Sequence, residues 1–236
     1  MTRFFIRMLM LLVLCSALFM SCEARIEGSL AADGSASLTV NMSLYSRMET
    51  MIQNLFSAAG QQGNVLESSS IARSMSDAPG IASVTLRNTS PSAINGQIRI
   101  SQISEFLSAV GEQGFITFER RGTGGRAEIN INRRNGHKIL ELLSPQITDY
   151  LNALMAPIVT EEEISKNEYL ELVTGFYNRN ISDEIVRSAI RASIDFPGNI
   201  TRAAGGTFSG RRAVFNIPLL DLLVLETPLR YEVTWN

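Results

Sequence analysis

The sequence has very few of the residues that build metal centres and nucleophilic active sites. Of its 236 residues, only two are cysteine and only one, His137, is histidine. A metal site made of several histidines is therefore excluded, and a serine–histidine–aspartate triad would need His137 itself. Basic residues number 21 against 23 acidic ones, so no positive excess exists to neutralise nucleic-acid phosphates. We expect no metal, no cofactor and no nucleic-acid partner, and the sequence points to no catalytic residue.

Glycine and proline are also too scarce, at 17 and 7 residues, for a collagen-like or low-complexity chain. The chain is 45% hydrophobic, which is ample for the core of one large domain. The long apolar run is at the start, from Met8 to Met20, and follows Arg3 and Arg7. This length is typical of the apolar part of a secretory signal and is shorter than a membrane span of about 20 residues. A retained N-terminal anchor helix is the alternative.

The apolar run ends in Leu18-Phe19-Met20-Ser21-Cys22. A small residue followed by cysteine at this place resembles a bacterial lipoprotein signal. Phe19 stands where leucine is usual, so the segment is similar to the relaxed lipobox of spirochaetal lipoproteins. The resemblance implies cleavage before Cys22, a diacylglycerol on its sulfur, and a fatty acid such as palmitate on the new N-terminus.

Cysteine usage agrees with lipidation. Cys15 lies in the segment to be removed, so the mature chain keeps Cys22 alone and has no disulfide. The alternative is a free thiol at Cys22. We therefore expect a signal peptide at 1–21, a lipidated tether at 22–28 and a single domain at 29–236. The protein would be exported and lipid-anchored to the cell membrane or the outer membrane, with its oligomeric state open.

Hydrophobic periodicity predicts strands near both ends of the mature chain and a helical middle. Residues 36–44 alternate strictly and follow Asp33-Gly34, which predicts a hairpin with residues 26–30. Thr160-Glu161-Glu162-Glu163 is interpreted as the capped start of a helix rather than as a Ca²⁺ site. Further predicted strands and helices follow the same rules: strands at 81–88, 96–101, 115–121, 126–133, 189–196, 213–217 and 229–235; helices at 48–56, 66–75, 103–110, 140–158 and 164–176. Ser144-Pro145 interrupts the segment 140–158, which predicts two helices or one kink there. The pattern favours an α+β fold with a mostly antiparallel sheet and helices packed on one side, with a parallel α/β fold as the alternative.

Two features are candidates for ligand binding. Arg120, Arg121 and Arg126 lie close together across the predicted hairpin, where they would hold an anionic head group or a partner's carboxylates. Ordinary solvent-facing strand charge is the alternative. The apolar stretches 139–158 and 219–225 would line a cavity for acyl chains or simply form core.

The order of elements also resembles small LppM-like bacterial lipoproteins. The residues concerned are Phe196-Pro197-Gly198, Gly205-Gly206, the segment 214–218, and a terminal strand ending in Trp235. The resemblance implies an α+β body that binds lipids or glycolipids. We therefore expect a membrane-anchored binding module for a lipid or another apolar ligand, with no enzymatic activity assigned. A carboxylate-dependent envelope hydrolase and an assembly or adhesion factor are the alternatives.

Overall fold

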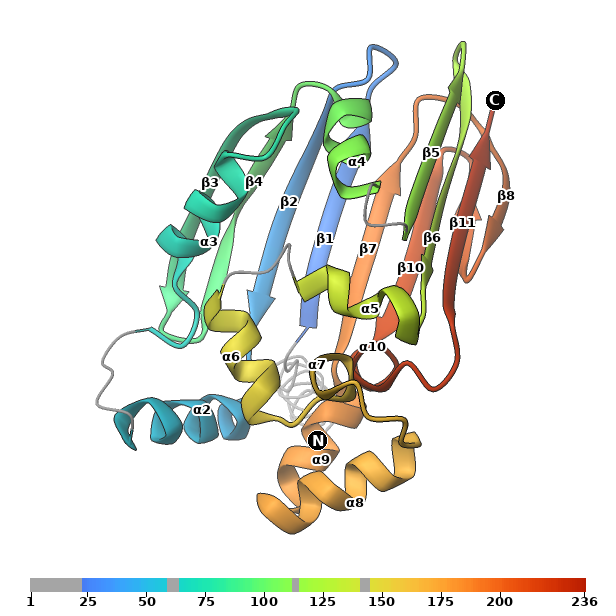
Figure 1. The fold of residues 1–236 in the computed structure, drawn as a ribbon. Coiled ribbons are helices and arrows are strands. Elements are labelled where there is room, and N and C mark those ends of the chain that lie inside the picture. Colours follow the sequence, from blue (N-terminus) through green and yellow to red (C-terminus); the bar gives the residue numbers. More distant parts are fainter. Residues whose placement is uncertain (1–22, 59–63, 112–114, 141–144) are drawn as a thin grey trace, which may run out of the picture.

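The computed structural model describes residues 23–58, 64–111, 115–140 and 145–236 (Figure 1). The signal peptide predicted at 1–21 and the acceptor Cys22 lie outside these ranges. The same holds for Gly60 and Gly114, the glycines that follow the helices predicted at 48–56 and 103–110 and that are typical helix-ending residues.

The larger sheet has seven strands in the described part of the chain. They are β1 (Glu23–Leu30), β2 (Ala36–Ser43), β3 (Ile81–Ser90), β4 (Ala93–Ile100), β7 (Ala189–Asp195), β9 (Gly206–Ser209) and β10 (Arg212–Pro218). Their order is β3-β4-β2-β1-β7-β10-β9. All neighbours are antiparallel except β1 and β7, which run parallel with Glu23 opposite Ala189 and Ser29 opposite Asp195. The first strand therefore lies at the centre of the sheet.

The predicted hairpin between β1 and β2 is confirmed. Gly34 has φ +92°, a left-handed value that glycine adopts without strain. The Asp33 carboxylate accepts hydrogen bonds from the Ser35 N–H at 2.9 Å and its hydroxyl at 2.7 Å. These bonds hold the pKa of Asp33 below its ordinary value. The Asp-Gly pair therefore forms the tight turn that its chemistry predicts.

A smaller antiparallel sheet lies beside the larger one. Its strands are β5 (Ile116–Arg121), β6 (Gly124–Ile131), β8 (Ile200–Ala204) and β11 (Leu229–Trp235), in the order β5-β6-β11-β8. The chain passes from β8 into β9 of the larger sheet through Gly205, at φ +73°. A Cβ at this position would lie 2.4 Å from the Arg230 carbonyl oxygen, so glycine is needed at the corner between the sheets.

The helices complete an α+β fold, as predicted. They are α2 (Ser46–Ala58), α3 (Ser68–Ser76), α4 (Ile103–Gly111), α5 (Arg133–Leu140), α6 (Pro145–Ala153), α7 (Pro157–Thr160), α8 (Lys166–Phe176), α9 (Arg179–Arg187) and α10 (Leu219–Val224). Figure 1 shows α3, α4 and α6 lying over one side of the larger sheet, while α2, α8 and α9 gather beyond the start of β1. We call this group of three helices the helical end. No helix in the described ranges has the length and apolar character of a transmembrane span.

Two hydrophobic clusters form the core. The larger cluster packs the helices against the strands, and it contains Leu154, Ile158 and Leu223 to Leu225. The two apolar stretches considered as cavity walls therefore contribute side chains to the core. The smaller cluster lies between the two sheets and contains Leu30, Phe196, Ile200, Ala213, Val233 and Trp235.

The helix start predicted at 160–163 was wrong. Glu161 has φ +60° and ends α7, so the glutamates at 161–163 do not open a helix. The capping box lies five residues later, where the Ser165 hydroxyl accepts from the Glu168 N–H and the Glu168 carboxylate accepts from the Ser165 N–H. Residues 23–28, expected to belong to a tether after Cys22, lie in β1.

Candidate functional site

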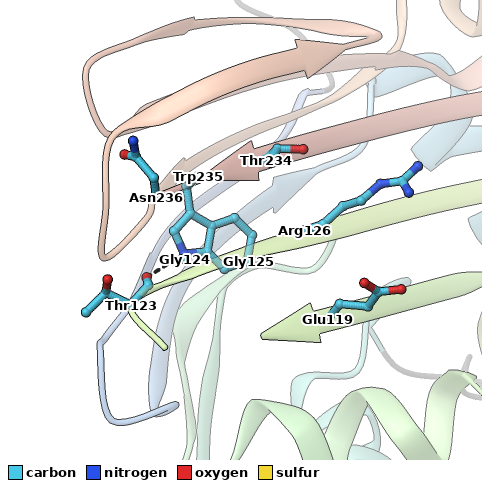
Figure 2. Close-up of a pocket in the computed structure, with 8 residues that line it drawn as sticks. All are labelled: Glu119, Thr123, Gly124, Gly125, Arg126, Thr234, Trp235 and Asn236. Carbon is cyan, nitrogen blue, oxygen red and sulfur yellow. Dashed lines mark hydrogen bonds between the residues drawn. The ribbon is translucent and has the colours of Figure 1, made fainter. Parts of the chain in front are cut away.

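The tip of the β5–β6 hairpin and the end of β11 enclose an open hollow of about 530 Å³ (Figure 2). Two glycines, hydroxyl and amide side chains, one ion-pairing arginine and an indole line it: Glu119, Thr123, Gly124, Gly125, Arg126, Thr234, Trp235 and Asn236. We call it the hairpin hollow. The hollow lies where the glycine-rich turn predicted from the sequence meets the last strand.

Trp235 forms the floor of the hairpin hollow. Its indole is 97% buried and packs against Phe196 and Phe118, with ring centroids 4.9 and 5.9 Å away. The indole N–H donates to the Thr123 carbonyl oxygen at 3.1 Å, which ties the turn to the last strand. A Cβ at Gly125 would lie 2.4 Å from the indole, so glycine lets the ring lie directly beneath the strand.

Arg126 lines the hollow, but its charge is balanced locally. Its guanidinium lies 2.8 Å from a Glu128 carboxylate oxygen and 3.2 Å from a Glu232 oxygen. Glu119 stands opposite Arg126 in the register of β5 and β6, on the same face. Two carboxylates contact this guanidinium and a third lies on the same face, which makes the face a poor site for a strongly anionic head group.

The structure does not bring the three predicted arginines together. Arg120 and Arg126 occupy opposite faces of the hairpin, because Arg126 is paired with Glu119 and side chains alternate along a strand. The Arg120 Nε donates to the Gly122 carbonyl oxygen at 3.3 Å, and its guanidinium adds a small lowering effect to the pKa of Asp33. Arg120 therefore lies beside the β1–β2 turn. The Arg121 side chain is outside the described part of the structure.

A hydrolase of the expected kind would need two carboxylates that face each other, and one such pair lies near the hairpin hollow. Glu128 and Glu232 are directly opposite in the β6–β11 register. Arg126 bridges both, so they form an ion-pair network and neither lines the hollow. This arrangement does not resemble an acid–base pair flanking a substrate.

A second groove, of about 260 Å³, contains His137. Arg133 and Arg134 line one side and the glutamates at 161–163 the other. The Arg133 guanidinium donates to the Ile164 carbonyl oxygen at 2.7 Å and lies 3.9 Å from Glu163. The described residues contain no group of three or more histidine, cysteine, aspartate or glutamate side chains placed to hold a metal ion.

A third groove, of about 480 Å³, runs between α2 and the turn from α8 to α9. Leu55 and Phe176 are among its lining residues, and both are exposed. Arg47 is the single charged residue that lines it; the rest are polar or apolar, including Asn54 and Asn178. We call it the helical groove. Sequence patterns gave no indication of it, because α9 was not predicted and the groove needs α2 and α9 side by side.

A buried carboxylate holds the two sides of the helical groove together. Glu184 on α9 is only 4% exposed and accepts hydrogen bonds from the backbone N–H groups of Arg47 and Met48, at 3.3 and 2.8 Å. A carboxylate at a helix N-terminus satisfies free donors and interacts favourably with the helix dipole. Arg187 adds a cation–π contact, 5.5 Å above the Tyr45 ring. In the sequence, Glu184 could have been noticed as a charge within the apolar stripe of Ile181 and Ile185.

Comparison with known proteins gives little further guidance. No protein-family model and no curated protein sequence matches the chain. One similar solved structure is the NMR structure of the folded domain of LppM from Mycobacterium tuberculosis. The two share 9% sequence identity, with 92% of each chain covered and a TM-score of 0.42. No functional residue is transferred from it, and the function must be argued from this chain's own residues.

Proposed function

We propose that the protein is a cell-envelope lipoprotein, anchored by acyl chains on Cys22, whose folded body is a binding module. The observation that carries this proposal is the segment Leu18-Phe19-Met20-Ser21-Cys22, in which an apolar run ends in a small residue followed by cysteine. This is the pattern of a lipoprotein signal. Glu23, the residue bonded to Cys22, lies in the central strand β1, so an anchor on Cys22 would be held close to the folded body.

The anchor explains how a body without an apolar spanning helix in its described ranges stays at a membrane. Each buried CH₂ contributes about 0.8 kcal/mol, and one chain of myristoyl length binds only marginally. Two or three chains on one cysteine make release negligible. Attachment therefore demands nothing of the folded surface, which is left for binding.

The hairpin hollow is the best candidate for the binding site. Arg120 places the β5–β6 hairpin next to the β1–β2 turn, at the end of β1 opposite to Glu23 (Figure 1). The hollow therefore opens away from the end of the molecule that would carry the anchor. The indole floor, the glycine backbone, the hydroxyl and amide groups and one charge of each sign, Glu119 and Arg126, suit a ligand with both apolar and hydrogen-bonding parts, such as a lipid whose polar head group has no net charge.

The anchor is tested by mass spectrometry of the mature N-terminus in wild type, Cys22→Ala and Cys15→Ala. We expect acyl mass on Cys22 in the wild type and in Cys15→Ala, because residue 15 would be removed with the signal. Cys22→Ala should remain uncleaved and carry no acyl mass. An unmodified thiol at Cys22, with residues 1–21 still attached, would contradict the proposal.

The hollow is tested by native mass spectrometry of the protein purified from its membrane, with any co-purified lipid identified. We expect Thr123→Trp, which places a bulky side chain at the rim, to lose the co-purified species. Ser209→Trp, on the exposed end of β9, is the matched control and should retain it. Equal retention by both variants would exclude the hairpin hollow as the site.

A further inference from the structure

Exposed apolar side chains concentrate at the helical end. Among the side chains that the structure describes, five large hydrophobic ones are exposed, and three of these are on α2, α8 and α9. They are Leu55, Phe176 and Val186, with Phe176 the most exposed at 71%. The other two, Phe208 and Val214, lie on the edge strand β9 and on its neighbour β10. Phe176 leaves most of its ring outside the core, and Leu55 lines the same groove, so the two form an apolar patch of the kind found at interaction surfaces.

The helical end lies where the anchor would enter the bilayer. Glu23 is opposite Ala189 in the parallel register, and α9 ends at Arg187, just before that strand. On the other side of β1, strand β2 ends at Ser43 and α2 begins at Ser46. Figure 1 shows α2, α8 and α9 projecting past the start of β1.

The single peptide bond between Cys22 and Glu23 restricts how far the folded body can lie from the membrane. Consecutive Cα atoms are about 3.8 Å apart, so Cys22 lies no further than this from the first residue of β1. If its acyl chains are in the bilayer, the start of β1 is at the head groups. Helices that project beyond that point must then enter the interfacial layer.

The chemistry of the helical groove suits that layer. Its rim carries Leu55 and Phe176, and Arg47 is its single charge, with no carboxylate among the lining residues. Aromatic and aliphatic side chains next to a cation are typical of surfaces that rest at the boundary between head groups and acyl chains. An arginine is also a good partner for a lipid phosphate.

The surface is also preformed. Glu184 fixes α9 to the start of α2, as described above. At the end of α8, the Tyr177 hydroxyl donates to the Ala153 carbonyl oxygen, and the Tyr169 hydroxyl donates to that of Leu154 at 3.1 Å. These bonds leave Phe176 projecting from a fixed helix end rather than from a loop.

We propose that the surface of the helical end around the helical groove, with Leu55, Phe176 and Arg47, is a membrane-docking face that seats the lipoprotein on the phospholipid head groups. This inference rests on the proposed anchoring at Cys22. It gives the body a fixed orientation, with the hairpin hollow directed away from the bilayer. The occupant of the groove would be the phospholipid surface itself.

The test uses the full-length lipoprotein, acylated in cells and reconstituted in vesicles of phosphatidylcholine and phosphatidylglycerol. The acylated chain offers no free thiol, so Phe176→Cys and Phe208→Cys each introduce a single site for an environment-sensitive fluorophore. Both residues are exposed phenylalanines, and Phe208 is the matched control because β9 lies away from the helical end. We expect iodide to quench the label at position 176 several-fold less than the label at 208, and lipid-borne nitroxide to quench it several-fold more.

The outcomes are distinguishable. Equal quenching at both positions, with acyl mass present on Cys22, overturns the docking face and leaves the anchor intact. Absence of acyl mass overturns the anchor and the docking face together. Protection of position 176 that rises with protein density in the vesicles indicates a second copy on this face and overturns the proposal. Since Phe176 is mostly exposed, its replacement removes little buried surface, and the thermal midpoint of both variants should match that of the wild type.

Discussion

The helical end differs from the opposite end of the molecule, where the β5–β6 hairpin lies and which we call the hairpin end. The two ends differ in which kinds of side chain are buried and which are exposed. At the helical end a carboxylate, Glu184, is buried between two helices while Phe176 points outward. At the hairpin end the largest aromatic side chain, Trp235, is buried, and the charges around Arg126 pair on the outer face. The comparison teaches that the hairpin end has the usual distribution of a soluble surface. The helical end departs from it at the helical groove, where Leu55 and Phe176 are exposed beside the single charge of Arg47.

The largest effect should come from Trp235→Ala, which empties the centre of the smaller core cluster and removes the tie to the Thr123 carbonyl. We expect a loss of about 3–5 kcal/mol in the free energy of unfolding. Hydrogen exchange should accelerate in β6 and β11 more than in α8 and α9. Phe208→Ala, on an exposed residue, is the control and should cost below about 1 kcal/mol. A uniform acceleration across both ends would show that the ends are not separate units.

Glu184→Ala should have the next largest effect, now at the helical end. It leaves two backbone donors at the start of α2 without their acceptor, at a cost of about 1–3 kcal/mol. Exchange of the Arg47 and Met48 amides should accelerate, while the hairpin end should be unchanged. Asp183→Ala, its exposed neighbour on α9, serves as the control. An unchanged exchange rate at residues 47 and 48 would contradict the role assigned to Glu184.

Two glycine-to-alanine substitutions, one at each end of the molecule, should change the stability in opposite directions. Gly125→Ala would place a Cβ against the indole and should destabilise by about 1–3 kcal/mol. Gly175→Ala, in α8 with no atom near the added Cβ, should stabilise by about 0.5–1 kcal/mol. Urea unfolding of both variants measures these opposite signs. Two changes of the same sign would contradict the close packing of Trp235 beneath Gly125.

The smallest effect concerns the surface pair Asp195 and Arg212, joined by two hydrogen bonds of 2.8 and 2.6 Å. The arginine holds the pKa of Asp195 below its ordinary value. A lowered carboxyl pKa stabilises the fold above the unfolded pKa, and this stabilisation is lost as the pH falls through the folded pKa. Arg212→Gln should therefore be slightly less stable than the wild type at neutral pH, with the difference disappearing below about pH 4.

Urea unfolding at neutral and acid pH checks this expectation. In the background of Asp195→Asn, the Arg212→Gln substitution should have the same small effect at both pH values. A pH-dependent effect in that background would assign the titration to another carboxyl.

The local elements were predictable where a turn signal or a clean period marked them. The alternation from Ala36 to Ser43 and the Asp-Gly turn identified β2 and its hairpin partner. The first residues of β1 were not predicted as strand, although Glu23, Arg25 and Glu27 alternate with smaller side chains. They follow Cys22 directly and were interpreted as a tether. The polar segment of α9 was missed because only Ile181, Ile185 and Val186 in it are strongly apolar.

The arrangement that makes the candidate sites could not be predicted, because it depends on contacts between distant parts of the chain. Glu184 reaches the start of α2 from 136 positions along the sequence. Arg126 meets Glu232 only because β11 is the neighbour of β6. Periodicity identifies which residues share a face of one element, but it does not say which elements are neighbours. Grouping the three arginines by sequence distance therefore failed to anticipate that Arg120 and Arg126 occupy opposite faces.

The parallel pairing of β1 with β7 also sets the order in which the chain can fold. Residues that face each other across these strands are 166 positions apart, as for Glu23 and Ala189. Pairings of such long range form slowly, since a large loop must close before any contact compensates for the lost chain entropy. The strand that follows Cys22 therefore has no complete sheet to join until residues 189–195 have arrived. For a chain exported as proposed, this delay would keep the central strands unpaired until most of the polypeptide has crossed the membrane.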